Sequence, residues 1–98
     1  MEVRFASTVL KTLETEGNCK GKYAENVVRG YRKVLNVIRA AKNEHDVRAM
    51  KSLNFEKLKG GRSHQHSLRI NKQWRLIVEI ETRQNNNIIN IKSIEDYH

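Results

Sequence analysis

A chain of 98 residues is long enough for one domain and too short for a second hydrophobic core. Only 38% of its residues are hydrophobic and 6% are aromatic, so the core must be thin, as in a single sheet covered by one layer of helices. Its 19 Lys and Arg residues against 11 Asp and Glu residues give a formal net charge of +8, which favours a polyanionic partner such as nucleic acid.

Cysteine content and hydropathy exclude several classes of protein. Cys19 is the only cysteine, so neither an intrachain disulfide nor a cysteine-based metal cluster can form. No apolar run reaches the length of a transmembrane helix, and the first residues lack the apolar core of a signal peptide. We therefore expect a cytoplasmic protein that does not interact with membranes.

The first half of the chain predicts a short strand and two helices. Residues 2–5 alternate weakly, as in a strand. Ser7 is a candidate N-cap for a helix over residues 8–16, which Gly17 and Asn18 would end, and a loop follows over 17–21. A second helix is predicted over residues 22–42. Its apolar residues recur at spacings of three and four, as Ala24, Val27, Val28, Tyr31, Val34, Leu35, Ile38 and Ala41. We interpret this stripe as core rather than as a docking groove.

The second half changes from helical to strand periodicity. A short helical turn is predicted around residues 47–53. Strands are then predicted over residues 66–70, 73–81 and 88–94, the first two joined by a tight turn at Asn71 and Lys72.

The alternation of side chains along these strands assigns residues to two faces of a sheet. The face beneath the helices would hold Leu68, Ile70, Trp74, Leu76, Val78, Ile80, Ile89 and Ile91. Arg69, Gln73 and Arg75 would lie together on the uncovered face, where an antiparallel sheet can carry a polar site. The predicted fold is a single α+β domain over residues 1–98, with two layers in the order β-α-α-β-β-β. Two N-terminal helices would pack on a small, twisted, mainly antiparallel sheet.

Familiar cofactor and metal motifs do not occur in this sequence. There is no glycine-rich phosphate loop, no HExxH and no zinc-type spacing of Cys and His. His64 and His66 could chelate a metal weakly, but no third ligand is evident, and we interpret both as surface histidines. The sequence therefore predicts no cofactor and no bound metal.

Two clusters could carry chemistry. Residues 56–62 (EKLKGGR) form a basic loop whose glycines permit close approach to a phosphate. Residues 95–98 (EDYH) are rich in titratable and hydrogen-bonding groups. Each cluster also has a simpler interpretation, since the first could be an ordinary surface turn and the second an exposed tail.

These two clusters, together with residues 67–76 (SLRINKQWRL), resemble the signature blocks of the HigB-type killer toxins, which belong to the RelE superfamily of messenger-RNA interferases. The resemblance implies a RelE-like fold and a toxin of a type II toxin–antitoxin system. It further implies an endoribonuclease that depends on the ribosome, cuts messenger RNA in the decoding site and so inhibits translation. The implied partner is a helix-turn-helix, HigA-like antitoxin, through which alone the toxin would reach operator DNA.

The resemblance assigns roles residue by residue. The catalytic residues it implies are Lys59 in the loop, Arg75 in the strand and the C-terminal triplet of Asp96, Tyr97 and His98. We assign RNA binding to Lys57, Arg62, Arg69 and Gln73. Two positions depart from some relatives: Glu56 stands where certain members have histidine, and Gln73 where certain members have asparagine.

The chemistry of these residues suits cleavage of RNA without a metal. The ribose 2′-hydroxyl must lose a proton, the charge on phosphorus must be stabilised, and the leaving 5′-oxygen must gain a proton. Arg75 and Lys59 would stabilise the charge. An unperturbed histidine titrates near neutrality, so His98 would carry the proton, oriented by Asp96. Tyr97 could stack on a base, bind phosphate or pack against the core, and the identity of the general acid and base remains open.

Two other interpretations are compatible with the same residues. The chain could be an RNA- or ribosome-binding module that occludes the decoding site without cutting. It could also be a degenerate toxin that serves only as antitoxin partner and co-repressor.

Overall fold

A five-stranded sheet forms the centre of the protein. The computed structural model describes residues 1–15, 23–84 and 86–96, and the strand order is β1-β5-β4-β3-β2. The strands are β1 (Glu2–Phe5), β2 (Glu56–Lys57), β3 (His66–Arg69), β4 (Trp74–Arg83) and β5 (Asn86–Asp96). Neighbouring strands run antiparallel, except that β1 is parallel to β5. The predicted mainly antiparallel sheet is confirmed.

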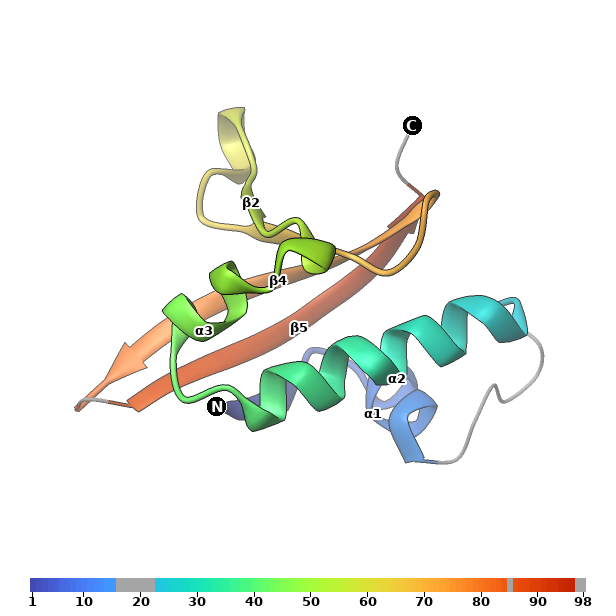
Figure 1. The fold of residues 1–98 in the computed structure, drawn as a ribbon, viewed down its shortest axis with the longest axis horizontal. Helices are drawn as coiled ribbons and strands as arrows, with labels where there is room; N and C mark the ends of the chain where they lie inside the picture. The colour runs from blue at the N-terminus through green and yellow to red at the C-terminus, as the bar shows by residue number, and fades with distance from the viewer. Residues whose placement is uncertain (16–22, 85, 97–98) are drawn as a thin grey trace.

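Two of the helices lie on one side of strands β4 and β5, and the hairpin at the β2 edge of the sheet rises on the other side (Figure 1). The helices are α1 (Thr8–Thr15), α2 (Glu25–Ala40) and α3 (Glu44–Ala49), with 3-10 turns η2 (Lys51–Leu53) and η3 (Gly60–Arg62). Helices α1 and α2 cover one side of β4 and β5, whereas the hairpin that carries β2 and η3 rises on the other side (Figure 1). The predicted two-layer α+β fold is confirmed. No helix in the described ranges is long and apolar enough to cross a membrane.

Helix α1 begins where the sequence predicts. The Ser7 hydroxyl accepts a hydrogen bond from the backbone N–H of Leu10 at 3.3 Å, as an N-cap residue does. Leu10 and Leu13 then turn the apolar side of the helix into the core. Gly17 and Asn18, the predicted end of this helix, lie outside the described residues, as does the predicted loop over 17–21.

Helix α2 is the principal partner of the sheet. It begins at Glu25 rather than at residue 22, and Ala24, at the N-cap, is exposed rather than buried. The remaining predicted stripe is buried, as Val27, Val28, Tyr31, Val34, Leu35, Ile38 and Ala41. The Tyr31 hydroxyl donates to the Leu10 carbonyl at 2.6 Å, which ties α2 to α1. The stripe is therefore core, as predicted.

The turn between β3 and β4 is held by one side chain. Asn71 Oδ1 accepts hydrogen bonds from the backbone N–H groups of Gln73, at 2.9 Å, and Trp74, at 2.8 Å. The N–H of Ile70 donates to the Trp74 carbonyl at 2.9 Å and closes the hairpin. An asparagine that satisfies successive N–H groups in this way fixes a turn, so the predicted hairpin is confirmed.

Every residue predicted beneath the helices contributes to the core. Leu68, Leu76, Val78, Ile89 and Ile91 are buried in the core cluster, and Ile70, Trp74 and Ile80 pack against it. Helix α2 approaches β3 closely at Gly30, where an added Cβ would lie 2.7 Å from Ile70 Cγ2. This close approach holds the helical layer on the end of the sheet that carries the hairpin turn.

The opposite face of the sheet is less open than the sequence predicts. Arg69 and Gln73 are exposed on it, but Arg75 is only 4% exposed. The residues after η2 lie over this part of the sheet, and the Arg75 guanidinium donates to the Asn54 carbonyl at 2.7 Å. The prediction that Arg75 lies on an uncovered face is therefore wrong, because the segment that enters β2 covers it.

Candidate functional site

Polar residues from three strands meet where β5 ends and β4 begins. Arg75 pairs in register with Arg69 of β3 on one side and with Glu95 of β5 on the other. Cross-strand neighbours on one face lie close enough for their side chains to interact. Arg69, Arg75 and Glu95 therefore form a row across three strands, at one end of the face opposite the helices.

Asp96 is fixed by a contact from the β3–β4 turn. Gln73 Nε2 donates to Asp96 Oδ2 at 3.0 Å, and both residues are exposed. Gln73, which we assign to RNA binding, is thus in direct contact with Asp96, which the family resemblance assigns to catalysis.

The Arg75 guanidinium is held in place beneath the surface. Its Nη2 donates to the Asn54 carbonyl and to the Ser67 hydroxyl, both at 2.7 Å, and lies 3.4 Å from the Ser67 carbonyl. A buried guanidinium with several oxygen partners keeps one orientation. The structure therefore provides a fixed positive charge just below the outer face.

The basic loop of residues 58–65 connects β2 to β3. The N–H of Leu58 donates to the Gln65 carbonyl at 2.9 Å and closes the base of the loop. Gly60 has a φ of +66°, a conformation that residues with a side chain rarely adopt. Lys57 and Lys59 are exposed, and neither ammonium group forms an ion pair or hydrogen bond with the described residues. Both lysines are therefore available to an anionic ligand.

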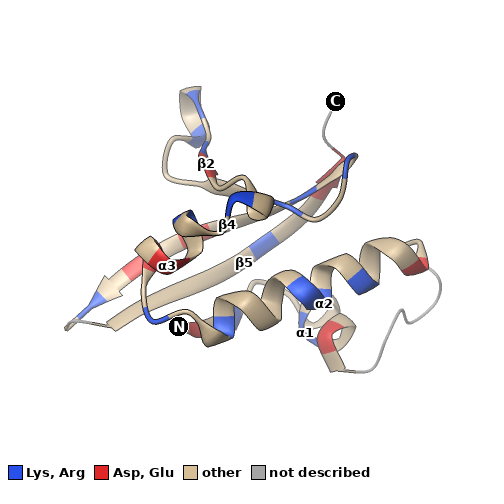
Figure 2. Ribbon diagram, viewed as in Figure 1, with Lys and Arg blue, Asp and Glu red and all other residues tan. Residues whose placement is uncertain are grey.

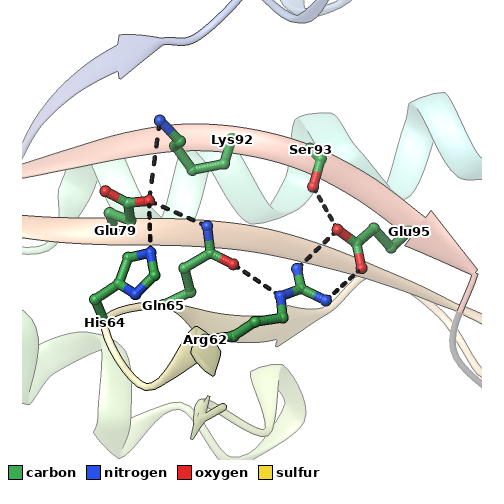
Figure 3. A network of polar contacts seen from close by, with 7 residues as sticks. All are labelled: Arg62, His64, Gln65, Glu79, Lys92, Ser93 and Glu95. Atoms are coloured by element: carbon green, nitrogen blue, oxygen red, sulfur yellow. Dashed lines mark hydrogen bonds and ion pairs between the residues drawn. The ribbon is translucent and has the colours of Figure 1, made fainter. Parts of the chain in front are cut away.

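An ion pair ties this loop to the end of β5. Arg62 donates to both carboxylate oxygens of Glu95, at 3.1 and 2.8 Å, and its Nε donates to Gln65 Oε1 at 3.0 Å (Figure 3). The Ser93 hydroxyl also donates to Glu95, at 2.8 Å. The hydrogen bonds from Arg62 hold the pKa of Glu95 below its usual range, and Glu95 raises the pKa of Arg62. The loop and the last strand are thereby joined across 33 residues of sequence.

A second anchor holds the loop at Glu79 of β4. Gln65 Nε2 donates to Glu79 Oε2 at 3.0 Å, and His64 Nε2 lies 3.6 Å from the same oxygen (Figure 3). Lys92 Nζ of β5 approaches it at 3.9 Å. Sequence patterns did not indicate a role for Glu79, because a glutamate in an alternating strand is typical of any solvated carboxylate.

His64 of the loop and His66, the first residue of β3, differ in environment. The His64 side chain is 61% exposed, as predicted, whereas His66 is partly buried and stacks on Phe55 with ring centroids 4.8 Å apart. Burial lowers the pKa of His66, and its Nδ1 is buried with no hydrogen-bond partner in the described part of the chain. The interpretation of His66 as a surface histidine is therefore wrong.

The predicted site residues are thus partly brought together. Gln73 contacts Asp96 directly. Arg62 contacts Glu95, the residue before Asp96 in β5. Tyr97 and His98 lie outside the described residues. Within the described ranges, no group of three or more His, Cys, Asp or Glu side chains could hold a metal ion.

Positive charge extends beyond this end of the sheet. Figure 2 shows Lys and Arg along α2 and in the turn between β3 and β4, as well as on the hairpin that carries β2. Negative residues are interspersed, among them the acidic first turn of α3. The surface suits a large polyanion that contacts several elements.

Sequence comparison identifies the family. The model of the HigB-like toxins, described as RelE-like toxins of the type II toxin–antitoxin system HigB, matches residues 3–98. No curated protein has a significantly similar sequence.

Solved structures share the fold at low sequence identity. A YoeB/ParE toxin from Agrobacterium tumefaciens is similar with a TM-score of 0.63 and 14% identity, and the match covers 100% of both chains. A YoeB–YefM complex from Staphylococcus aureus gives a TM-score of 0.61 and 20% identity over 100% of this chain and 97% of the other. A YoeB dimer from the same organism gives a TM-score of 0.57 and 20% identity, over 100% of this chain and 97% of the other. At these identities the likeness is one of fold.

Proposed function

This chain belongs to the HigB-like family of RelE-like toxins from type II toxin–antitoxin systems, and on that premise we propose that it is a ribosome-dependent endoribonuclease. In this proposal the protein enters the decoding site of a translating ribosome and cuts the messenger RNA there. Loss of the message then inhibits translation.

One observation supports this assignment above the others. The Arg62–Glu95 ion pair and the Gln73–Asp96 hydrogen bond bring the loop, the β3–β4 turn and the end of β5 to one end of the sheet. These segments carry the blocks in which the sequence resembles the HigB-type toxins. The segments that carry the proposed cationic groups and the proposed carboxylate therefore lie at the same end of the sheet.

The proposed reaction is attack by the ribose 2′-hydroxyl on the adjacent phosphorus. The new O2′–P bond closes a 2′,3′-cyclic phosphate, and the P–O5′ bond breaks. We assign stabilisation of the transition-state charge to Lys59, at the surface, and Arg75, whose guanidinium is fixed by Ser67 and Asn54. These roles require no cofactor.

Proton transfer is assigned to the C-terminal triplet. Histidine is the side chain whose ordinary pKa of about 6.5 suits a group that both accepts and donates a proton near neutrality, and we assign this role to His98. Asp96 would orient it, and Gln73 in turn holds Asp96. The assignments of Tyr97 and His98 come from the family resemblance alone, with Tyr97 placed against the substrate base or phosphate.

In this proposal the ribosome orients the substrate for the site. Few groups here are strong acids or bases, but orientation of the reacting atoms can lower a barrier by about 7 kcal/mol or more. A message held in the decoding site is already oriented. The cationic side chains of α2 and of the β2 hairpin would dock on ribosomal RNA, so association should weaken as salt rises.

We also propose a partner and a location. The partner is a helix-turn-helix antitoxin of the HigA type, which would neutralise the toxin and carry it to operator DNA. The YoeB–YefM complex from S. aureus is a solved example of this fold in a complex. The location is the cytoplasm, where translating ribosomes are found.

The direct test uses purified translating ribosomes, a defined message and mapping of the cut ends. Wild-type protein is expected to give discrete cuts in the decoding site, and Lys59→Gln is expected to cut about a hundredfold more slowly. Lys11→Gln removes an exposed lysine of α1 and should cut like the wild type. Stalled ribosomes with an intact message would instead indicate a non-cleaving binding module. No effect on translation at high protein concentration would indicate a degenerate toxin.

A further inference from the structure

The three cations of the β2–β3 hairpin are not equivalent. Lys57 and Lys59 form no ion pair or hydrogen bond with the described residues, whereas the Arg62 guanidinium donates to both oxygens of Glu95. Arg62 is the only one of these side chains with the planar fork that matches two oxygens of a phosphate. The best phosphate ligand of the loop is therefore occupied by a carboxylate of the same chain.

This ion pair lies where solvent and ligand can reach it. The side chains of Arg62 and Glu95 are 48% and 40% exposed. Ion pairs this exposed contribute little to stability, because water solvates both groups once they separate. The Ser93 hydroxyl would remain hydrogen-bonded to Glu95 after Arg62 left. Separation of the pair therefore leaves no buried charge without a partner.

The loop would stay docked when the pair opens. Gln65 donates to Glu79 at 3.0 Å through Nε2, whereas Arg62 Nε contacts the other end of the same amide, Oε1, so the anchor to Glu79 is a separate hydrogen bond. The Arg62 side chain can thus turn away from Glu95 while the backbone that carries Lys59 remains in place.

We propose that Glu95 sets the affinity of this protein for RNA by occupying the phosphate-binding guanidinium of Arg62 in the free protein. Binding of RNA exchanges one anion for another, as a backbone phosphate replaces the Glu95 carboxylate on the same fork. The identity of the ligand rests on the proposed function, whereas the exchange itself does not depend on cleavage.

The test is the affinity of Glu95→Gln for a short single-stranded RNA at low salt, measured by fluorescence anisotropy without ribosomes. Glutamine keeps the shape of the side chain and removes the charge that holds Arg62, so binding should tighten about threefold to tenfold. Glu81→Gln is the matched control, because Glu81 lies on the same sheet, pairs with Arg83 and carries the same charge. Both variants raise the net charge equally, and only Glu95→Gln should gain this affinity.

The Arg62→Gln variant and the double variant complete a cycle. Arg62→Gln should weaken binding and reduce the dependence of log affinity on log salt concentration by about 0.7, the contribution of one phosphate contact on a single strand. In the Arg62→Gln background, Glu95→Gln should give no more gain than Glu81→Gln. An affinity of Glu95→Gln equal to or weaker than that of Glu81→Gln would overturn the proposal. So would unchanged binding by Arg62→Gln, or no binding of the RNA by any variant. Failure of cleavage on ribosomes would instead count against the proposed function alone.

Discussion

Gln73 and Asp96 are 23 residues apart in sequence, yet Gln73 Nε2 donates to Asp96 Oδ2 at 3.0 Å across the end of the sheet. The hydrogen bond joins the β3–β4 turn to the residue that precedes Tyr97 and His98. Gln73 is itself fixed at its backbone N–H by Asn71. The turn therefore acts as a support for the segment to which we assign proton transfer.

Gln73→Ala is expected to slow cleavage while leaving the fold intact. Loss of the contact removes one of the constraints on Asp96, and misplacement by about 1 Å can cost up to about a hundredfold in rate. The hydrogen bond is exposed, so the free energy of unfolding should change by less than about 1 kcal/mol. Ribosome-bound cleavage rates and urea unfolding curves measure the two effects. Thr82→Ala, which removes an exposed hydrogen bond at the far end of the sheet, should change neither.

Arg75 and Arg69 are neighbours in register but should respond differently to replacement by lysine. Arg75→Lys keeps the charge and loses the Nη2 group that donates to Asn54 and Ser67, so it should cost about 1–3 kcal/mol of stability and roughly a hundredfold in cleavage rate. Arg69→Lys changes an exposed side chain and should stay within about 0.5 kcal/mol of the wild type. Equal stability of the two variants in urea would show that the buried contacts of Arg75 contribute little.

Gly30→Ala is expected to destabilise the protein even though alanine favours helices. The new Cβ would lie 2.7 Å from Ile70 Cγ2 and 3.0 Å from the Ile70 carbonyl oxygen. Relief of this overlap should cost about 1–3 kcal/mol, against a gain in helix propensity of about 1 kcal/mol. Urea unfolding measures the balance. A Cβ at Gly61 meets nothing within 4 Å, so Gly61→Ala should be close to neutral, and a Gly30→Ala variant as stable as Gly61→Ala would argue against tight packing of α2 on β3.

His66 is expected to make the fold less stable in mild acid. Burial is the main cause that lowers the pKa of His66. The charges of Arg48 and Lys57 lower this pKa further, whereas the charge of Glu44 raises it. As the pH falls below the ordinary value of about 6.5, the unfolded chain binds a proton that the native chain disfavours, so stability decreases.

The measurement is the urea midpoint of unfolding at about pH 7.5 and at about pH 5.5. His66→Phe keeps the stack on Phe55 and removes the titrating ring, so the midpoint should fall less between these two conditions. His64→Gln replaces an exposed imidazole and serves as control. If the two variants lose the same stability in acid as the wild type, the protonation of His66 does not matter to the fold.

Local patterns were sufficient to predict most of the fold. The alternation around Trp74 and Leu76 identified β4 and its buried face, and Asn71 marked the turn before it. The stripe from Val27 to Ile38 identified α2 and its role in the core. These features depend on residues close in sequence, for which periodicity and turn chemistry are informative.

The environment of the site depends on contacts that sequence patterns do not encode. Residues 50–57 carry no periodic apolar pattern, so nothing indicated that Asn54, with a φ of 45°, would cover Arg75. The pairing of Arg62 with Glu95 spans 33 residues and depends on the path of the loop. The family resemblance identified Lys59, Arg75 and Asp96 as candidate catalytic residues. It did not indicate that Glu95 forms an ion pair with Arg62.

The central claim is that the 2′-hydroxyl of the message attacks the neighbouring phosphorus, and one substituted message tests it most directly. A defined message carrying a single 2′-deoxynucleotide on the 5′ side of the mapped cut is placed in the decoding site and incubated with the wild-type protein. The account predicts that cleavage at this bond disappears, while the unmodified message gives an upstream fragment with a 2′,3′-cyclic phosphate. Cleavage of the deoxy-substituted bond at the normal rate would contradict the account, because the proposed nucleophile would then be absent.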